Sequence, residues 1–306
     1  MFAASPRAAV VGSLVSLVSV ASCGGAIGNP AGDGNGGDFA PPTAGPFDAA
    51  TGPIPPPAQK GGYQLGSPVP FARDGGTASD AGGPNTPGCA TILGVVRDFM
   101  AYDPATGGGH PDFERYTGGG ARTRIVDTRL DMYRKPVYVA SGQPVVTTSK
   151  FYFDQWYSNV DGVNKPYFIN FYLVPNGGVY TFQSTPFFPL DSRGWGNESN
   201  PHNFHFTTEV HTEFIYTGGE TFSFSGDDDL WVFVNGMLAL DLGGPHPSLT
   251  GVIDLDAIAT NFALARGRQY PLDLFHAERH TDESNFRIDT NIQFVRCNIL
   301  VPDPPR

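Results

Sequence analysis

Charged residues, methionines and long apolar runs are all scarce in this sequence. Charged residues make up 16% of its 306 residues, against roughly 25% in typical globular proteins. The 19 Lys and Arg residues face 30 Asp and Glu residues, which gives a formal net charge of −11. No basic cluster is available to neutralise phosphates, and no apolar run reaches the ~18 residues that span a bilayer. Nucleic-acid binding is therefore disfavoured, and integral membrane transport is excluded.

Glycine, proline and aromatic residues are abundant instead. The chain has 39 Gly and 28 Pro, and aromatic residues make up 12% of it. Aromatic side chains are enriched in strands, so this composition favours a strand-rich fold over a helix bundle.

The first 22 residues resemble a lipoprotein signal peptide. Arg7 gives a weakly positive start, and residues 8–21 form an apolar stretch as long as a signal-peptide core. The stretch ends in Val20-Ala21-Ser22-Cys23, which resembles the bacterial lipobox. We expect cleavage before Cys23 and a lipid on its sulfur, so that the protein meets the membrane through a lipid anchor only. The alternative is an ordinary secretory signal. The two glycines that follow favour the outer membrane or cell surface, with extracellular release as a further destination.

Residues 23–88 are predicted to be the lipid anchor and a disordered tether. Positions 24–88 contain 17 Gly and 12 Pro. Such a segment buries too little apolar surface to offset its chain entropy. A coil of this length spans roughly 45 Å, which would lift a folded domain clear of the lipid surface.

The two remaining cysteines, Cys89 and Cys297, flank the rest of the chain. An exported protein enters an oxidising compartment, where such a pair is normally oxidised. We predict a disulfide between them, and two buried free thiols are the alternative.

Residues 89–298 are predicted to be all-β, an antiparallel β-sandwich followed by a C-terminal tail at 299–306. Asn176-Gly177-Gly178 and Asn235-Gly236 are hairpin signals, and short helices are expected within Asp254–Ala263 and Phe151–Tyr157. The predicted strands, which alternate in polarity or are rich in β-branched and aromatic residues, are Thr91–Val96, Val137–Val139, Tyr167–Val174, Val179–Gln183, Glu209–Tyr216, Thr221–Ser225, Leu230–Val234, Leu238–Leu242, Gln269–Phe275 and Asn285–Phe294.

The sharpest chemical feature is the acidic run Asp227-Asp228-Asp229, directly before the apolar strand Leu230–Val234. Adjacent carboxylates repel one another unless a cation compensates them, and oxygen ligands of this kind suit Ca²⁺. Neighbouring side chains on an extended chain point to opposite faces, so two Asp residues on one ion require a distorted backbone. A solvated acidic turn is the alternative interpretation.

Several motifs in this head resemble the bacterial fibro-slime domain, which is related to the protective-antigen-type β-sandwich of anthrax-toxin protective antigen, yeast flocculins and glycosidase-attached modules. The resemblance spans about residues 90–297. The segments that carry it are Phe224–Gly236 and Leu240–His246, together with Arg97–Phe99, His110–Glu114, Asn203–Glu209, Phe275–His280 and Ser284–Phe286.

The resemblance implies a calcium site. In sugar-binding members of the wider family, an Asp-Asp pair eight and nine residues before a hairpin glycine adopts a cis peptide. That pair holds Ca²⁺, which also binds the vicinal hydroxyls of a glycan. Asp227 and Asp228 match this pair against Gly236. By position, the loop that completes the calcium shell is His280–Asn285.

The predicted metal ligands are Asp227, Asp228, Asp229, Asp282 and Asn285. The predicted ligand-binding residues are Trp231, Asn235, Asp241, His246, Glu278, Arg279 and His280. Trp231 is either a platform for a sugar ring or a core tryptophan, and the sequence leaves both open.

Signals for catalysis are weak. No G-x-S-x-G, P-loop or dinucleotide-binding fingerprint occurs. His276 and His280 have the end spacing of a zincin helix without its second-position Glu, and their surroundings are predicted as strand. Glu278 and Asp241 are unconstrained candidates for a hydrolase carboxylate pair.

One further polar set lies on a single predicted strand. Glu209, His211 and Glu213 alternate and so share a face. This face is interpreted as a solvated strand surface, with a metal site as the less favoured alternative.

The sequence therefore predicts a surface-anchored, calcium-dependent carbohydrate-binding and adhesion module rather than an enzyme. Its partner would be an exopolysaccharide or a cell-surface glycan. The first alternative is a structural matrix or protein-binding module with purely structural calcium, and the second is a cryptic polysaccharide hydrolase.

Overall fold

The computed structural model describes residues 62–69, 89–115, 121–139 and 146–305. The predicted signal peptide, the predicted lipidation site Cys23 and most of the predicted tether lie outside the described residues. Within the described part, no helix is long and apolar enough to cross a membrane.

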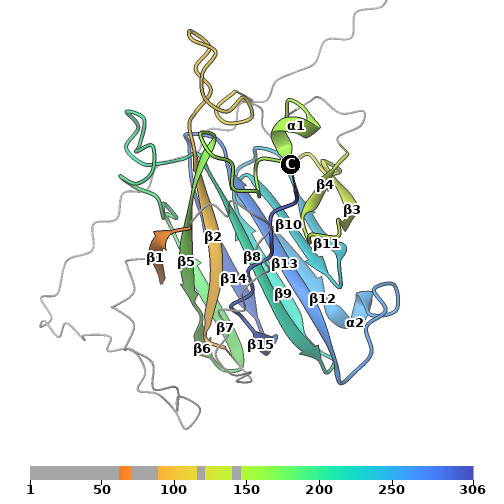
Figure 1. Cartoon of the computed structure of the whole chain (residues 1–306). Helices are drawn as coiled ribbons and strands as arrows, with labels where there is room; N and C mark the ends of the chain where they lie inside the picture. Colours follow the sequence, from red (N-terminus) through yellow and green to blue (C-terminus); the bar gives the residue numbers. More distant parts are fainter. Residues whose placement is uncertain (1–61, 70–88, 116–120, 140–145, 306) are drawn as a thin grey trace, which may run out of the picture. The chain divides into compact units, whose positions relative to one another are not determined.

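The fold is an antiparallel β-sandwich of a ten-stranded and a five-stranded sheet, which confirms the predicted class (Figure 1). The larger sheet has the order β1 (Tyr63–Pro68), β5 (Asn164–Tyr172), β2 (Thr91–Phe99), β8 (Phe206–Tyr216), β13 (Arg268–Glu278), β10 (Asp229–Val234), β11 (Met237–Leu242), β3 (Val126–Leu130) and β4 (Pro136–Tyr138), and β15 (Phe294–Arg296) also pairs with β8. The smaller sheet has the order β12 (Leu249–Asp254), β9 (Thr221–Gly226), β14 (Phe286–Thr290), β7 (Val179–Ser184) and β6 (Val174–Asn176).

Local sequence signals account for the turns and helices. Asn235 and Gly236 both have positive φ, of 52° and 70°, between β10 and β11, as a two-residue hairpin loop requires. Gly177 and Gly178 do the same between β6 and β7. Two short helices form, α1 (Lys150–Phe153) and α2 (Leu255–Ile258), and the Asp254 side chain caps α2 by accepting from two backbone N–H groups.

Strand β10 shows why the larger sheet has two buried faces. All six of its residues are buried. Leu230, Val232 and Val234 belong to the core between the sheets. Trp231 and Phe233 belong to a second core on the opposite face. A strand that is covered on both faces has a continuous apolar sequence, because neither set of alternating side chains faces solvent.

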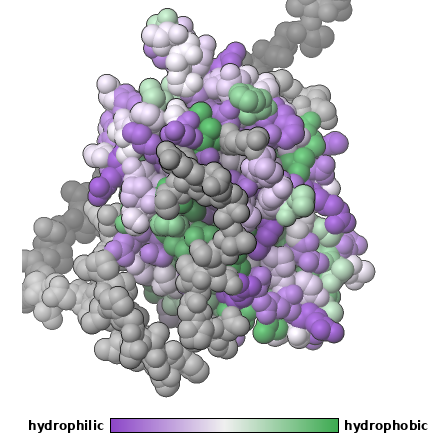
Figure 2. Space-filling view, in the orientation of Figure 1, coloured by the Kyte–Doolittle hydropathy of each residue, from purple (hydrophilic) through white to green (hydrophobic). Residues whose placement is uncertain are grey.

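The second core is roofed by the segment that connects β2 to β5. Phe113, Phe153 and Trp156 of this segment are fully buried, and α1 lies over this face of the larger sheet in Figure 1. The face of the molecule in Figure 2 is mainly hydrophilic, with hydrophobic residues in small groups.

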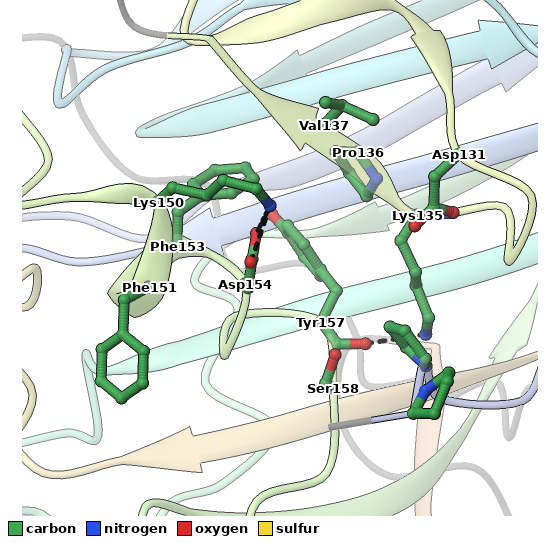
Figure 3. Close-up of a pocket in the computed structure, with 12 residues that line it drawn as sticks. Asp131, Lys135, Pro136, Val137, Lys150, Phe151, Phe153, Asp154, Tyr157 and Ser158 are labelled. Carbon is green, nitrogen blue, oxygen red and sulfur yellow. Dashed lines mark hydrogen bonds and ion pairs between the residues drawn. The ribbon is translucent and has the colours of Figure 1, made fainter.

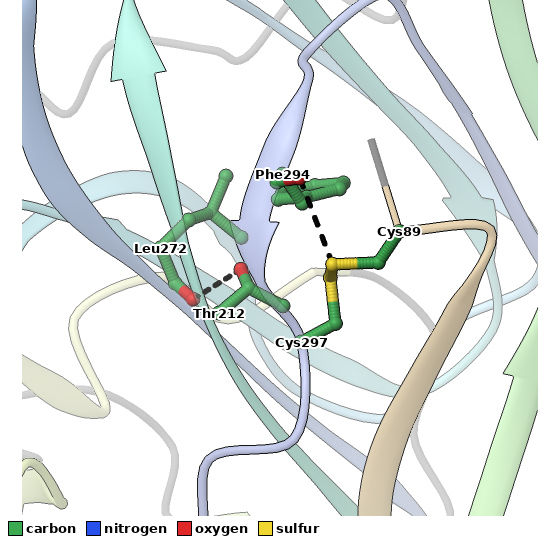
Figure 4. The surroundings of a disulfide bond; sticks show 5 residues. All are labelled: Cys89, Thr212, Leu272, Phe294 and Cys297. Atoms are coloured by element: carbon green, nitrogen blue, oxygen red, sulfur yellow. Dashed lines mark hydrogen bonds between the residues drawn. A yellow bond between two sulfur atoms is a disulfide. The ribbon is translucent and has the colours of Figure 1, made fainter. Parts of the chain in front are cut away.

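The predicted disulfide is present. Cys89 and Cys297 are bonded, with Cα atoms 6.3 Å apart (Figure 4). The bond joins a cysteine two residues before β2 to the residue directly after β15 and so closes nearly the whole sandwich into one loop.

The predicted domain start at residue 89 is too late. Within the segment expected to be a disordered tether, Tyr63–Pro68 forms β1, which pairs with β5. Tyr63 is only 6% exposed, and its ring meets that of Phe187 edge-on at 5.3 Å. The high Gly and Pro content of this segment predicted no strand. One buried aromatic residue and a free edge of β5 are nevertheless enough to hold a short strand.

Candidate functional site

Two crossovers between the sheets meet at one end of the sandwich. Asp227 and Asp228 connect β9 of the smaller sheet to β10 of the larger one, and residues 279–285 connect β13 back to β14. Gly226 pairs with Phe286 in the smaller sheet, so the two connections run side by side. Gly226 is needed there, because a Cβ atom would lie 2.5 Å from the carbonyl oxygen of Asn285.

The backbone of the acidic run is distorted, as we expected if neighbouring Asp side chains are to face the same side. The distortion is not the cis peptide that the family resemblance implies. The cis peptide bond of the described residues is Thr185–Pro186. Asp228 instead has a φ of +53°, a left-handed conformation that costs a non-glycine residue energy. The two Asp residues therefore leave the alternating pattern of a strand.

Asp229 is neutralised by the protein itself. Its Oδ2 atom lies 2.6 Å from Nε of Arg279, and both side chains are buried. Its Oδ1 atom accepts from the N–H of Gly244 at 2.5 Å. We predicted Asp229 as a metal ligand and Arg279 as a ligand contact, whereas the structure pairs them with each other.

Asp227 and Asp228 face the other crossover. Asp227 is 3% exposed and accepts from the backbone N–H of Asn285 at 2.5 Å and from its side-chain amide at 3.2 Å. Asp228 accepts from the backbone N–H of Arg279 at 2.8 Å. Burial, opposed by the charge of Arg279, raises the pKa of Asp228 to about 6.

Glu278 is the residue of the site whose burial the fold does not explain. It ends β13, is fully buried, and neither of its carboxyl oxygens makes a hydrogen bond of normal geometry, although Asp228 and Ser284 lie close enough to act on its pKa. Burial, and then the charges of Asp228 and Asp227, raise its pKa well above the usual value. A buried carboxylate without a well-placed donor is costly, so this oxygen-rich point is where a cation would compensate most charge.

The three carboxylates form the acidic site: Asp227, Asp228 and Glu278. With the amide of Asn285 beside them, they offer the hard oxygen ligands that Ca²⁺ prefers. Among the described residues, no group of three or more His, Cys, Asp or Glu side chains is arranged so that it could hold a metal ion. Ion binding would therefore require the acidic site to exchange the donors of Asn285 and Arg279 for the cation.

Other predicted contacts lie near the acidic site in different roles. The carbonyl oxygen of His246 accepts from the N–H of Asp228 at 3.3 Å, while its buried ring bonds two backbone carbonyls. Asp282 is exposed, and His280 is partly exposed beside Glu114. Asp282 and His280 belong to the second crossover, whose Asn285 hydrogen-bonds Asp227, and the contacts predicted for them stay predictions.

Three predicted ligand contacts do not face this site. Trp231 is fully buried in the second core, and its Nε1–H donates to Asp241 at 3.0 Å. The core interpretation of Trp231 is therefore the right one, and Asp241 is occupied with holding it. Asn235 lies at the far end of β10, about 20 Å from Asp229 at 3.3 Å per residue, and caps the carbonyl of Phe262.

The Glu209–His211 face is buried rather than solvated. His211 bridges Glu209 and Asp273, with both nitrogen–oxygen distances at 2.6 Å. Arg97 and Lys135 lie 2.7 and 2.6 Å from Glu209. The sequence missed Arg97, Lys135 and Asp273, because the roof that buries this face comes from a distant segment. His276 is likewise buried, on a strand instead of a zincin helix.

A separate pocket of about 420 Å³ lies between α1, β4 and the C-terminal tail (Figure 3). Phe151, Tyr157 and Pro304 line it, with Lys135 donating to the carbonyl of Tyr157 at 2.7 Å. None of the predicted site residues is among the described residues that line this pocket.

Comparison with known proteins finds a match to one domain family over less than half of the chain. Residues 159–300 match the family model of the PA14 domain, and this match takes in the acidic site. Two relatives from Dictyostelium discoideum are the protein psiR, 36% identical over 217 residues (65% of this chain and 21% of psiR), and the protein psiC, 33% identical over 238 residues (70% of this chain and 44% of psiC). The chain thus spans less than half the length of these relatives.

Two solved PA14 domains are also similar. A PA14 sugar-binding domain from an RTX adhesin is 9% identical, with 66% of this chain and 90% of that chain covered and a TM-score of 0.28. The PA14 domain of the MpAFP antifreeze protein is 8% identical, with 73% and 95% covered and a TM-score of 0.28. None of these comparisons tests the fibro-slime resemblance, which stays a prediction.

Proposed function

We propose that this chain is a surface-displayed adhesion module that binds carbohydrate through calcium held at the acidic site. Within the resemblance described above, it would be a fibro-slime member of the PA14-type sandwiches. The observation that carries the proposal is the buried carboxyl group of Glu278, which makes no hydrogen bond of normal geometry, beside Asp227 and Asp228. The PA14 match of residues 159–300 supports it independently.

The acidic site supplies what calcium needs. Asp227, Asp228 and Glu278 would hold the ion, with Asn285 as a neutral oxygen donor. Bound calcium would present open coordination positions to a pair of sugar hydroxyls. The exposed Asp282 and the partly exposed His280 lie on the same crossover, so they are placed to contact the rest of the sugar.

Glycan binding with and without a chelator tests this function. We expect the full chain to bind a subset of exopolysaccharides or cell-surface glycans in calcium and to lose binding in EGTA. Asp228→Asn should remove binding in calcium. Asp161→Asn, an exposed acid far from β10 in sequence, is the matched control and should bind like the wild type. Calcium-independent binding that survives Asp228→Asn would contradict the proposal.

The burial of the site favours one second candidate, a protein-binding module with structural calcium. Asp227 and Asp228 are 3% and 5% exposed, which shields an ion between them from a large ligand. In that case calcium would raise the melting temperature while no glycan binds. Binding rather than catalysis is proposed in both cases, since Asp241, the partner suggested for Glu278 in a hydrolase, accepts from Arg124, Trp231 and Gly243.

Surface display rests on Cys23. We propose that its lipid holds the protein at the outer membrane or cell surface. Cys23→Ser should move the protein from the membrane fraction to the soluble fraction, and an unchanged distribution would exclude the anchor.

A further inference from the structure

The segment that follows the disulfide carries an acid that turns toward the protein. Residues 299–305, the strap, begin at the buried Ile299 and pass Pro304, which lines the pocket beside α1. Asp303 lies between Pro302 and Pro304, and its side chain is only 29% exposed. Flanking prolines restrict the backbone, so the strap presents Asp303 in a defined direction. Neither the acidic site nor the pairing of the strands accounts for this acid.

Three donor groups meet at the carboxylate of Asp303. The backbone N–H of Asn159 donates to its Oδ2 atom at 3.0 Å. Nζ of Lys135 lies 3.6 Å from its Oδ1 atom, and Nη2 of Arg97 lies 3.9 Å from the same atom. A backbone N–H beside an ammonium and a guanidinium is a set of donors that recognises a carboxylate.

The charges around this point explain why an anion belongs here. Arg97 and Lys135 are both buried and share one close partner, Glu209, at 2.7 and 2.6 Å. One carboxylate balances only one of the two cations. The next acid of the network, Asp273, is paired with Arg134 and does not make up the difference. Because a buried cation without a partner is costly, the strap carboxylate supplies the missing negative charge.

The donors are held in place by contacts that do not involve the strap. Nε of Arg97 donates to the side-chain oxygen of Asn159 at 2.9 Å, which keeps this residue beside the guanidinium. Lys135 donates to the carbonyl of Tyr157 at 2.7 Å (Figure 3). Together with the short contacts to Glu209, these bonds keep the donor set assembled when the strap moves away.

The strap is also loosely packed. A cavity of about 70 Å³ is lined by Leu300 and Asp303 of the strap and by Gly94 and Arg97 of β2. The pocket of about 420 Å³ in Figure 3 adjoins the strap at Pro304. Voids of this size are few in a protein interior, so lifting the strap gives up little packing. The smaller cavity leaves space beside the donors for a small acid.

We propose that Arg97, Lys135 and the N–H of Asn159 form a carboxylate-binding site, which Asp303 fills as an intramolecular ligand until the carboxylate of an external ligand displaces it. The strap is then a displaceable cover of this site. The site takes an anion whereas the acidic site takes a cation, so the two are independent.

Chemical rescue of Asp303→Ala by acetate tests the proposal. The variant removes the strap carboxylate and leaves the donors in place. In chloride, we expect its urea midpoint to lie below that of the wild type. The midpoint should rise as acetate replaces chloride at constant ionic strength and pH, because acetate binds the folded state and not the unfolded chain. The wild type should not respond, since Asp303 already fills its site.

The matched control is Asp154→Ala. Asp154 is 46% exposed and pairs with Lys150 at the neighbouring pocket, so this variant loses the same charge without emptying the carboxylate site. Acetate should leave its midpoint unchanged.

Amide hydrogen exchange gives a second readout. The N–H of Asn159 should exchange faster in Asp303→Ala than in the wild type, and acetate should slow it again. Circular dichroism checks that the variant is folded, as we expect for a change on a segment without regular secondary structure. The same response of the wild type, Asp154→Ala and Asp303→Ala to acetate, or no response of Asp303→Ala, would overturn the proposal.

Discussion

At the scale of single residues, neighbouring acids have opposite roles. Asp229 is balanced by Arg279, whereas Asp228 and Glu278 crowd together without a cation. The first acid stabilises the apo fold, whereas burial and mutual repulsion raise the pKa values of the other two, so that ionising both without a cation is unfavourable. Substitutions that remove one charge at a time therefore separate structure from ion binding.

Asp229→Asn should destabilise the protein whether or not calcium is present. The variant leaves the buried guanidinium of Arg279 without its charge partner, which typically costs about 3–5 kcal/mol. Asp228→Asn should cost less than about 1.5 kcal/mol without calcium, because an amide oxygen can still accept from Arg279. Urea unfolding in EGTA measures both. Equal losses in the two variants would mean that Arg279 does not discriminate between these acids.

Residue type was easier to predict than residue environment. The acidic run and the late loop were placed together correctly, because a motif match carries their spacing. The burial of Glu278 and Trp231 could not be predicted, since it depends on which faces of β10 and β13 are covered. The described residues between β2 and β5 cover the face that holds Trp231, whereas Glu278 lies on the opposite face of the sheet, the side of Leu274 and the inter-sheet core. Nothing local to either strand predicts this covering.

At the scale of elements, the segment His110–Glu114 places a neutral histidine inside the roof. His110 packs edge-on against Phe99, Phe113 and Tyr152. Its Nδ1 atom accepts from the N–H of Asp112 at 3.2 Å. Burial lowers its pKa from 6.5 to about 3.

This histidine should make the fold sensitive to acid. Below pH 6.5 the unfolded chain binds a proton that the folded chain refuses, so stability falls as the pH falls, by about 1.4 kcal/mol per pH unit. Between pH 6.5 and 5 the contribution of His110 is about 2 kcal/mol. His110→Gln should reduce the loss over this interval by that amount in chemical denaturation. An identical pH dependence would show that His110 takes up its proton in the folded state.

Strand β8 gives a second test at this scale. Burial alone would raise the pKa of Glu209, but the charges of Lys135 and Arg97 hold it well below its usual value. Glu209→Gln should cost about 3–5 kcal/mol, because two buried cations lose their partner. Glu213→Gln, four positions further along the same strand and paired with Arg296 at 3.3 Å, should cost less than about 1 kcal/mol. Equally small losses of stability in the two variants would contradict this expectation, because they would mean that solvent screens Glu209 as it screens Glu213.

At the scale of the whole molecule, one covalent bond closes the sandwich. Cys89 and Cys297 are 208 positions apart, and a loop of that length corresponds to about 5 kcal/mol in the loop-entropy model. The double variant Cys89→Ser/Cys297→Ser should lose about 2–5 kcal/mol in denaturant unfolding. A loss below about 1 kcal/mol would mean that the sheets alone hold the chain ends together.

The antiparallel sandwich could largely be predicted from the sequence, whereas its first strand and its second core could not. The sandwich was predicted from the alternating strands, the two hairpin turns and the cysteine pair. Each of these signals follows from local chemistry. Strand β1 and the sharing of one sheet between two cores depend on long-range pairing. A Gly/Pro-rich stretch can still supply a six-residue strand where a sheet edge is free, as Tyr63–Pro68 shows.

The central claim is that calcium compensates the carboxylates at the crossover from β9 to β10. Calorimetric titration of the chelator-treated full chain with Ca²⁺, beside Asp228→Asn, Glu278→Gln and Asp161→Asn, tests it most directly. We predict one calcium ion per chain for the wild type and Asp161→Asn, and affinity reduced at least tenfold in the other two variants. Unchanged calcium affinity in Asp228→Asn and Glu278→Gln, or no binding by the wild type, would contradict the claim.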